Sequence, residues 1–173
     1  MNKAFTILAV AVAFFILLYS PKILSEFYLW NASLSEFFAE RAYYIALNLG
    51  AENLHREETT FTLQNGKHVY VTFTCVDLFM IGFNTALPFA VFILVLTMKN
   101  ISFTFAQAVI IFLIMMIFSI LMNIIRIAML LYLANNYYET FVQPVGWWSF
   151  HDAVGFSVMM FHTFVWLLIA LVI

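Results

Sequence analysis

The stretch SILMNIIRIAMLLYLA, residues 119–134, decides the fold class of this chain. It belongs to an apolar run over residues 101–135, and about 20 such residues cross the hydrocarbon core of a bilayer. Arg126 is the one charged residue in the stretch. An arginine at mid-membrane costs about 2.5–3.5 kcal/mol, so such side chains face the interior of a helix bundle. The stretch therefore predicts a membrane-spanning helix that carries one functional charge.

The composition of the whole chain agrees with this prediction. Of its 173 residues, 65% are hydrophobic, 19% aromatic and only 9% charged, whereas soluble domains carry about 25% charged residues. A chain this apolar would lack a polar surface in water, so we expect the bilayer to be its solvent. The net charge of −2, without any run of lysine or arginine, argues against a nucleic-acid partner.

Three more apolar runs, at residues 4–20, 76–98 and 151–173, are long enough to span a membrane. The sequence therefore predicts an all-α polytopic membrane protein with about four transmembrane helices in a single domain, 1–173. The first run resembles a signal peptide but lacks a small-x-small cleavage site, so we interpret it as an uncleaved anchor. Only Lys99 and Asn100 separate the second and third runs, which predicts a tight helical turn.

The polar region 20–74 connects the first two spans. Its middle part predicts an amphipathic helix, with Ser35 as the N-cap and Gly50 as the C-terminal stop. A small β-hairpin follows around Asn65-Gly66, the strongest short hairpin signal. A two-residue turn there would place Phe61 opposite Tyr70 and would lead the second strand straight into the second span.

The order of the spans predicts the topology. With the N-terminus inside, the region 20–74 and the loop 135–150 lie outside, and Lys99 lies inside. The distribution of basic residues supports this orientation weakly, because the long outer region carries basic residues as well.

One consequence is independent of that orientation. Cys75 begins the second span and His151 begins the fourth, both at the face opposite Lys99. A helix rises about 1.5 Å per residue, so Arg126 lies roughly 37 Å along the third span, at the same face. Three segments thus bring a thiol, a guanidinium and an imidazole to one level of the membrane.

Each of these residues also has an ordinary structural interpretation. Cys75 is the only cysteine, which excludes a disulfide framework and argues against structural zinc. A lone membrane cysteine usually packs as a small hydrophobe. Arg126 could snorkel to the interface, but apolar residues 127–133 follow it. Asn123 shares its helix face and is a candidate to hold the guanidinium.

The segment around His151 has features of a helix N-terminus. Ser149 is a candidate N-cap, and Asp152 suits the positive end of the helix dipole. Gly155 lies on the same face as His151, one turn later, and opens space for a close neighbour. The alternative is an interfacial histidine in an aromatic belt with Trp147 and Trp148.

Taken together, the three side chains indicate chemistry. An imidazole can take the proton of a thiol and return it to a leaving amine. An arginine beside them can stabilise the oxyanion of a tetrahedral intermediate. Cys75, His151 and Arg126 at one depth are therefore the groups that acyl transfer requires.

The hairpin leading into Cys75, the N-x-x-R of Asn123 to Arg126 and the H-x-x-x-G of His151 to Gly155 resemble the exosortase/archaeosortase family. The resemblance covers about residues 55–173. It implies a polytopic cysteine transpeptidase with Cys75 as nucleophile, Arg126 as electrostatic stabiliser and His151 as acid/base.

The resemblance also implies the substrates and the location. The partners would be exported proteins with a C-terminal motif, a transmembrane helix and a basic tail, met in the bilayer of the plasma (inner) membrane at its extracytoplasmic side. No cofactor and no metal are expected. Family members often follow the cysteine with a small residue and glycine, whereas Val76-Asp77 follow here and Gly82 is the nearest glycine. Many members also have more spans.

A second class of function stays open at this point. The chain would then be a non-enzymatic membrane assembly or secretion factor whose Arg126 pairs with a partner helix. A thiol redox carrier is disfavoured, because no second cysteine could resolve an intermediate. Among the other histidines, His162 is expected to pack in the interior, and His55 and His68 to be solvated.

Overall fold

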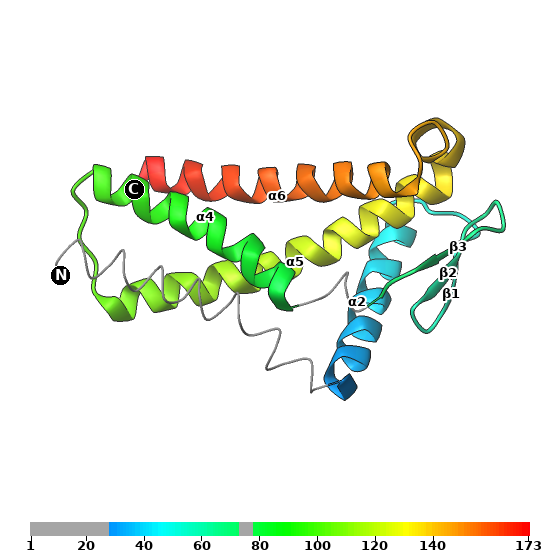
Figure 1. Cartoon of the computed structure of the whole chain (residues 1–173), viewed down its shortest axis with the longest axis horizontal. Coiled ribbons are helices and arrows are strands. Elements are labelled where there is room, and N and C mark those ends of the chain that lie inside the picture. The colour runs from blue at the N-terminus through cyan, green and yellow to red at the C-terminus, as the bar shows by residue number, and fades with distance from the viewer. Residues whose placement is uncertain (1–27, 73–77) are drawn as a thin grey trace. The chain divides into compact units, whose positions relative to one another are not determined.

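The computed structural model describes residues 28–72 and 78–173 (Figure 1). These residues belong to two compact units. The first unit contains Leu78–Ile120 and Met159–Ile173, and the second contains residues 28–72 and Leu121–Val158. The predicted first span and Cys75 lie outside the described residues.

Three long helices carry the apolar runs. They are α4 (Leu78–Met98), α5 (Phe105–Tyr137) and α6 (Trp147–Val172). The last two are long and apolar enough to cross a membrane, whereas the apolar part of α4, Asn84–Met98, is shorter. The predicted architecture of apolar helices with a small sheet is confirmed for the described residues, while the number of spans stays a prediction.

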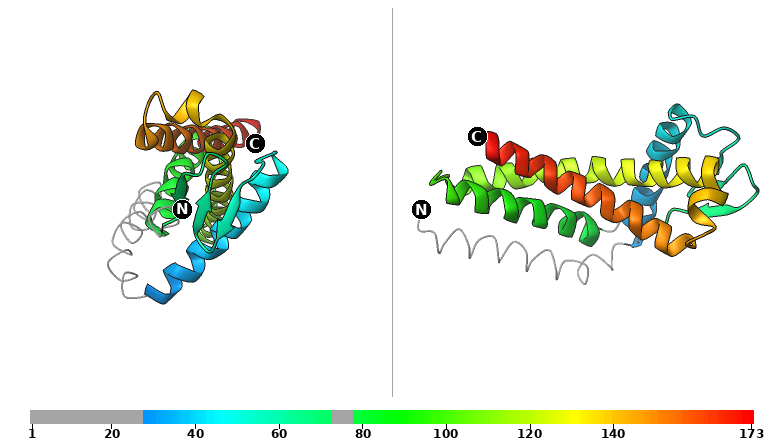
Figure 2. Two further views of the ribbon diagram at one scale, coloured as in Figure 1. Left: turned by 90° about the vertical axis from the view of Figure 1, so that its right-hand side faces the viewer. Right: turned by 90° about the horizontal axis from the view of Figure 1, so that it is seen from above.

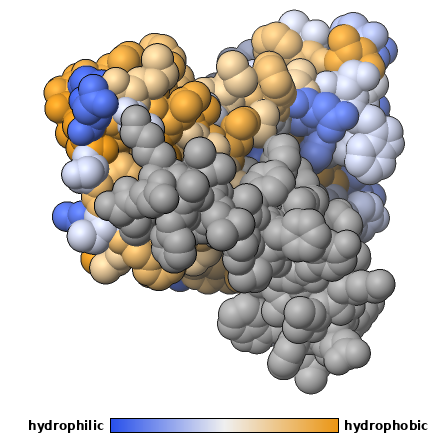
Figure 3. Space-filling model, turned by 60° about the vertical axis from the view of Figure 1, so that its left-hand side comes forward, coloured by the Kyte–Doolittle hydropathy of each residue, from blue (hydrophilic) through white to orange (hydrophobic). Residues whose placement is uncertain are grey.

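The surface of these helices is itself apolar, unlike that of the core helices of a soluble protein. Large hydrophobic side chains recur along one exposed face of α5, at Ile110, Leu113, Ile114, Ile117, Leu121 and Ile125. The space-filling view shows apolar side chains over much of the visible described surface (Figure 3). Such extended apolar surface requires an apolar surrounding, which agrees with the expected bilayer.

The core of the first unit forms where α4 packs against the N-terminal part of α5 and the C-terminal part of α6 (Figure 2). Phe89 packs edge-on against Phe112 with ring centroids 5.3 Å apart, and Phe92 packs edge-on against Trp166 at 5.8 Å. This is the preferred geometry of aromatic pairs. Met115 is fully buried among them.

The prediction of a tight two-residue turn between the second and third apolar runs is wrong. The connection between α4 and α5 is longer and runs over residues 99–104. Asn100 adopts a left-handed conformation with φ of 60°, and the Ile101 N–H donates to the Leu96 carbonyl at 2.9 Å, so α4 ends there. Thr104 and Gln107 then form a reciprocal capping box ahead of α5, with N–H to oxygen distances of 2.8 and 3.3 Å. These two terminal motifs set the length of the connection.

Lys99, at the start of this connection, has a definite structural role. Its Nζ donates to the carbonyl of Leu171 at 2.8 Å and to that of Ala170 at 3.4 Å. Both carbonyls belong to the last turn of α6, where a cation satisfies unpaired acceptors and complements the helix dipole.

The helix in the polar region, α2, runs over Tyr28–Asn48. It begins before Ser35, so the predicted N-cap at Ser35 is wrong and this side chain is buried within the helix. Its predicted stop is confirmed: Gly50 has φ of 96°, and the N–H groups of Gly50 and Ala51 donate to Leu47 and Ala46. This is the Schellman arrangement, which favours glycine.

The buried face of α2 is a stripe of mostly small residues. Phe38, Ala39, Ala42 and Ala46 are buried, whereas Tyr44 is exposed. The spacing of three and four residues places the buried set on one helix face. Phe37, Tyr44 and Leu47 are exposed, so apolar side chains also lie outside the buried face and the amphipathic character stays a prediction.

The sheet has three antiparallel strands rather than the predicted hairpin. They are β1 (His55–Glu57), β2 (Thr60–Thr62) and β3 (His68–Tyr70), in the order β1-β2-β3. The two outer strands each pair with β2. The additional strand, β1, precedes the segment from which the hairpin was predicted.

The predicted register is wrong by one residue. Phe61 pairs with Val69, and Tyr70 pairs with Thr60. The cause is a three-residue loop: the Gly66 N–H donates to the Leu63 carbonyl at 2.9 Å, and Gly66 has φ of 77°. A glycine with positive φ at this position is typical of three-residue hairpin loops. The observed register places the buried Phe61 opposite an aliphatic partner.

Candidate active site

The start of α6 differs from the prediction and moves His151 deeper into the helix. Gly146, with φ of 81°, precedes the first helical residue, and its carbonyl accepts the N–H of Phe150 at 3.1 Å. Gly146 is therefore the N-cap, a position that tolerates glycine. The predicted N-cap at Ser149 is wrong, and His151 lies in the second turn.

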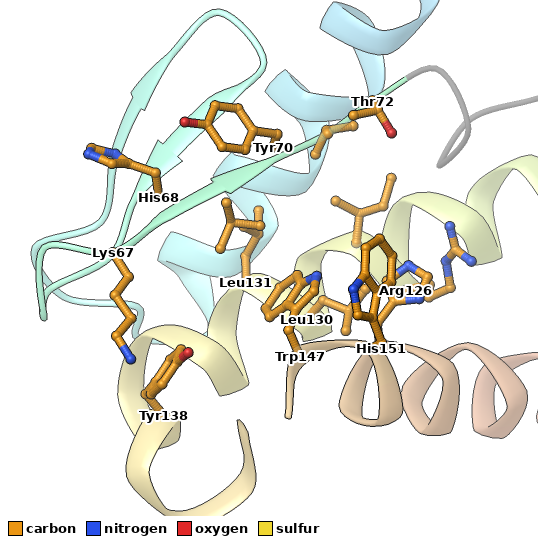
Figure 4. Close-up of a pocket in the computed structure, with 14 residues that line it drawn as sticks. Lys67, His68, Tyr70, Thr72, Arg126, Leu130, Leu131, Tyr138, Trp147 and His151 are labelled. Atoms are coloured by element: carbon orange, nitrogen blue, oxygen red, sulfur yellow. The ribbon is translucent and has the colours of Figure 1, made fainter. Parts of the chain in front are cut away.

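The second unit contains a cavity of about 540 Å³, a volume that is ordinary for ligand pockets. Three elements form its walls: β3 with its flanking residues, the C-terminal half of α5 with the following π-helix η1 (Tyr138–Val142), and the first turns of α6 (Figure 4). The lining residues are Lys67, His68, Val69, Tyr70, Val71, Thr72, Arg126, Ile127, Leu130, Leu131, Tyr138, Trp147, Trp148 and His151.

Arg126 is 8% exposed and lines this cavity. Gly155 lies directly against it: a Cβ atom added there would meet Arg126 Nη1 at 3.7 Å and Cδ at 3.8 Å. A methyl group would therefore fit at ordinary contact distance, whereas a larger side chain would displace the guanidinium. The space that Gly155 was predicted to open is occupied by the arginine side chain.

His151 lines the same cavity. Its Nδ1 lies 3.1 Å from Oδ1 of Asp152, and the Asp152 side chain is 79% exposed. With Nδ1 protonated, the ring donates to this carboxylate and Nε2 is left as a proton acceptor. The adjacent carboxylate can thus orient a general base, although its exposure to water makes the ion pair weak.

The structure brings together some of the predicted residues but not all of them. Arg126 and His151 share the cavity, with Gly155 against the arginine and Asp152 bonded to the histidine. Asn123 is buried one turn before Arg126 and is not among the residues that line the cavity.

Hydrogen bonds of Asn135, here called the clamp, hold the hairpin loop to the end of α5. They were not predicted from the sequence. Asn135, only 1% exposed, accepts the backbone N–H of Gln64 at 2.9 Å and donates to the Glu52 carbonyl at 2.8 Å. Gln64 Nε2 returns a bond of 2.6 Å to the Asn135 carbonyl, and Asn136 Nδ2 donates to Gly50. A sequence signal for this clamp does exist: two adjacent asparagines stand at the end of an apolar run.

The residues at one end of the cavity were not predicted from the sequence either. Lys67 Nζ lies 3.8 Å from the centre of the Tyr138 ring, a cation–π contact. His68, expected only to be solvated, is exposed but also lines the cavity, and its Nδ1 is 3.1 Å from the Thr62 hydroxyl.

The lining is mostly apolar and aromatic, with a few basic side chains. Lys67, Arg126 and two histidines contribute nitrogen atoms, and no aspartate or glutamate is among the lining residues that the structure describes. Within the described ranges, no three metal-ligating side chains gather at one place. Such a cavity suits a ligand rich in oxygen acceptors, such as a peptide backbone or a developing oxyanion.

The first unit places its polar side chains differently. His162 is 1% exposed, accepts Trp166 Nε1 at Nε2 over 3.0 Å and packs beside the Phe118 ring. Thr85 donates to the Ser119 hydroxyl at 2.9 Å, and both are buried. The structure therefore buries His162 in the interior, as predicted.

Comparison with known proteins adds one finding. The sequence model of a family described as transmembrane exosortase (Exosortase_EpsH) matches residues 2–169. No curated protein and no solved structure gives a match.

Proposed function

The chain belongs to the transmembrane exosortase family, and from this premise we propose that it is a membrane-embedded cysteine transpeptidase. It would cleave the C-terminal sorting signal of exported proteins and transfer the remaining protein to an acceptor. The substrates would carry a short motif, a transmembrane helix and a basic tail.

The proposed reaction assigns one role to each of three side chains. His151 takes the proton of the Cys75 thiol, and the thiolate sulfur forms a bond to the scissile carbonyl carbon. Arg126 stabilises the oxyanion of the tetrahedral intermediate. The C–N bond then breaks, His151 returns the proton to the leaving amine, and a thioester remains. A nucleophilic acceptor attacks that thioester and releases Cys75.

The observation that carries the proposal is that Arg126 and His151 line one cavity. Chain connectivity supports the third member of the set. Thr72 also lines the cavity, and Cys75 follows it by three residues.

The remaining features of the proposal concern the membrane. We propose a single domain, 1–173, with four spans near residues 4–20, 76–98, 101–135 and 151–173, the active site at the extracytoplasmic face and the plasma membrane as the location. The family match over residues 2–169 supports treating the chain as one domain. The two apolar helices support the third and fourth spans.

The test replaces the nucleophile. Cys75→Ala is expected to leave the protein inserted in the membrane at normal abundance and to stop processing of an exported reporter that ends in a motif, an apolar helix and a basic tail. Because Cys75 is the only thiol, an impermeant maleimide applied from outside should label the wild type and leave the variant unlabelled.

Normal processing by Cys75→Ala would contradict the acyl-enzyme. If Cys75→Ser is also harmless while Arg126→Ala breaks up a complex, the chain is instead an assembly factor whose arginine holds a partner.

A further inference from the structure

We propose that the polypeptide substrate binds in the cavity as an added β-strand along the free edge of β3. This inference rests on the proposed function, because it takes the substrate to be a protein segment. In β-strand addition, main-chain hydrogen bonds give affinity and pockets for alternate side chains give specificity. The proposal thus identifies the part of the chain that would hold the substrate backbone beside Arg126 and His151.

The first observation is the position of β3 in the sheet. Among the described residues, β3 pairs with β2 and with no other strand. The Leu63 N–H donates to the Lys67 carbonyl at 2.8 Å, and the Val71 N–H donates to the Thr59 carbonyl at 2.9 Å. The backbone groups of alternate residues point to opposite sides of a strand. Those of His68 and Tyr70 therefore point away from β2.

The second observation is that the cavity follows this edge. All six consecutive residues from Lys67 to Thr72 line it, and no residue of β2 does. A cavity against one face of the sheet would be lined by every second residue, because side chains alternate between the faces. The cavity therefore extends along β3 on the side away from β2, where the backbone groups of His68 and Tyr70 point.

The opposite wall suits an extended peptide. Leu130 and Leu131 of α5 and Trp147 of α6 offer apolar surface for substrate side chains. A bound strand of six residues would extend over about 17 Å between its end Cα atoms, at about 3.3 Å per residue, and would run alongside residues 67–72. In Figure 4, Lys67 and Tyr138 lie at one end of the cavity, and Arg126 and His151 lie toward the end at Thr72. A bound strand would thus pass from the cation–π pair to the proposed catalytic groups.

The test maps the register of the bound segment by disulfide cross-linking. The Cys75→Ser variant lacks cysteine, so single cysteines can be introduced at His68→Cys or Tyr70→Cys, both on exposed side chains. The reporter is an exported protein that ends in a motif, an apolar helix and a basic tail, with single cysteines placed in turn through the segment before the helix. The matched control is Glu57→Cys on β1, at the other edge of the same sheet, because Glu57 is exposed and shares the sheet face of Tyr70 through Thr60.

Strand addition predicts that the cross-linking yield alternates with a period of two residues along the reporter. Moving the enzyme cysteine from position 68 to position 70 should shift the maxima by two reporter positions, and Glu57→Cys should give background yield. A period of three to four residues, which indicates a helix, would overturn the inference. Uniform yields, or equal yields at Glu57→Cys, would overturn it as well.

The same reporter distinguishes failure of the proposed function from failure of strand addition. Processing by the wild-type chain is scored by release of the C-terminal segment, without cross-linking. An intact reporter there contradicts the transpeptidase, whereas a processed reporter without alternation contradicts only strand addition.

Discussion

Two pairs of polar residues on the same two helices, α5 and α6, have different surroundings. In the first unit, Ser119 and His162 are buried and bonded to Thr85 and Trp166. In the second unit, Arg126 and His151 line a cavity of about 540 Å³.

Under the proposed function, this difference separates polar groups that stabilise the helices from polar groups that act on a substrate. A buried polar group without a partner is costly, and the first pair avoids that cost with contacts inside the protein. The second pair presents nitrogen atoms to a space that a ligand can enter.

The two histidines of α6 give the sharpest contrast. His151→Gln is expected to lower the rate of reporter processing by about 10²–10⁴-fold, the usual contribution of a general acid–base group. His162→Gln keeps a polar side chain in the interior and should retain processing. Both rates are measured in membranes that contain equal amounts of enzyme. Equal losses for the two variants would remove the distinction between the units.

Arg126 is expected to have the next largest effect. Arg126→Ala should slow processing by about 10²–10³-fold, as the loss of one oxyanion donor typically does. Arg126→Lys keeps the charge but loses the planar guanidinium fork, so we expect it to recover only part of the activity. Initial rates with one reporter check both variants. Processing by Arg126→Ala at nearly the wild-type rate would show that the arginine has another role.

Gly155 tests the packing behind Arg126. Gly155→Ala adds a methyl group 3.7 Å from Nη1, an ordinary contact, and should leave processing nearly unchanged. Gly155→Leu must move the guanidinium, and misplacement of a catalytic group by about 1 Å can cost about 10²-fold. Membrane abundance of both variants provides the control. The idea fails if alanine and leucine have the same effect.

Asn135 tests whether the clamp holds the hairpin loop in place. Asn135→Ala removes the part-buried hydrogen bonds to the Gln64 N–H and the Glu52 carbonyl, and a hydrogen bond of this kind contributes about 0.5–1.5 kcal/mol to stability. Thermal unfolding in detergent measures the loss. Asn136→Ala is the comparison variant. Its side chain donates to the Gly50 carbonyl at a more exposed site and accepts one bond from Asn135 Nδ2, but it does not touch Gln64 or Glu52, so its loss should cost less. A larger loss for Asn136→Ala would contradict the assignment of the clamp to Asn135.

The positions of the long helices, and Arg126 and His151 as cavity residues, could be predicted from the sequence. The ends of the helices were predicted less well. Apolar runs long enough to span a bilayer identified α5 and α6, and the intramembrane charge identified Arg126. The errors at Ser35, Ser149 and Lys99-Asn100 concern helix termini, which depend on local bonds such as the capping box of Thr104 and Gln107. The sequence signals for such ends are short and degenerate.

The parts that the sequence did not reveal depend on contacts between distant segments. Asn135 reaches Gln64 across 71 positions of the chain, and Lys67 meets Tyr138 from another element. The register error at Phe61 arose from one extra loop residue at Gly66, and a one-residue change in register alters every pairing in the strand.

The central claim is that Cys75 forms a thioester with the substrate beside Arg126 and His151. Mass spectrometry of the purified enzyme after incubation with the reporter tests it directly. The account predicts an adduct on the peptide that contains Cys75, released by hydroxylamine and absent from Cys75→Ala. Continued processing by enzyme that never carries this adduct, or by Cys75→Ala itself, would contradict the account.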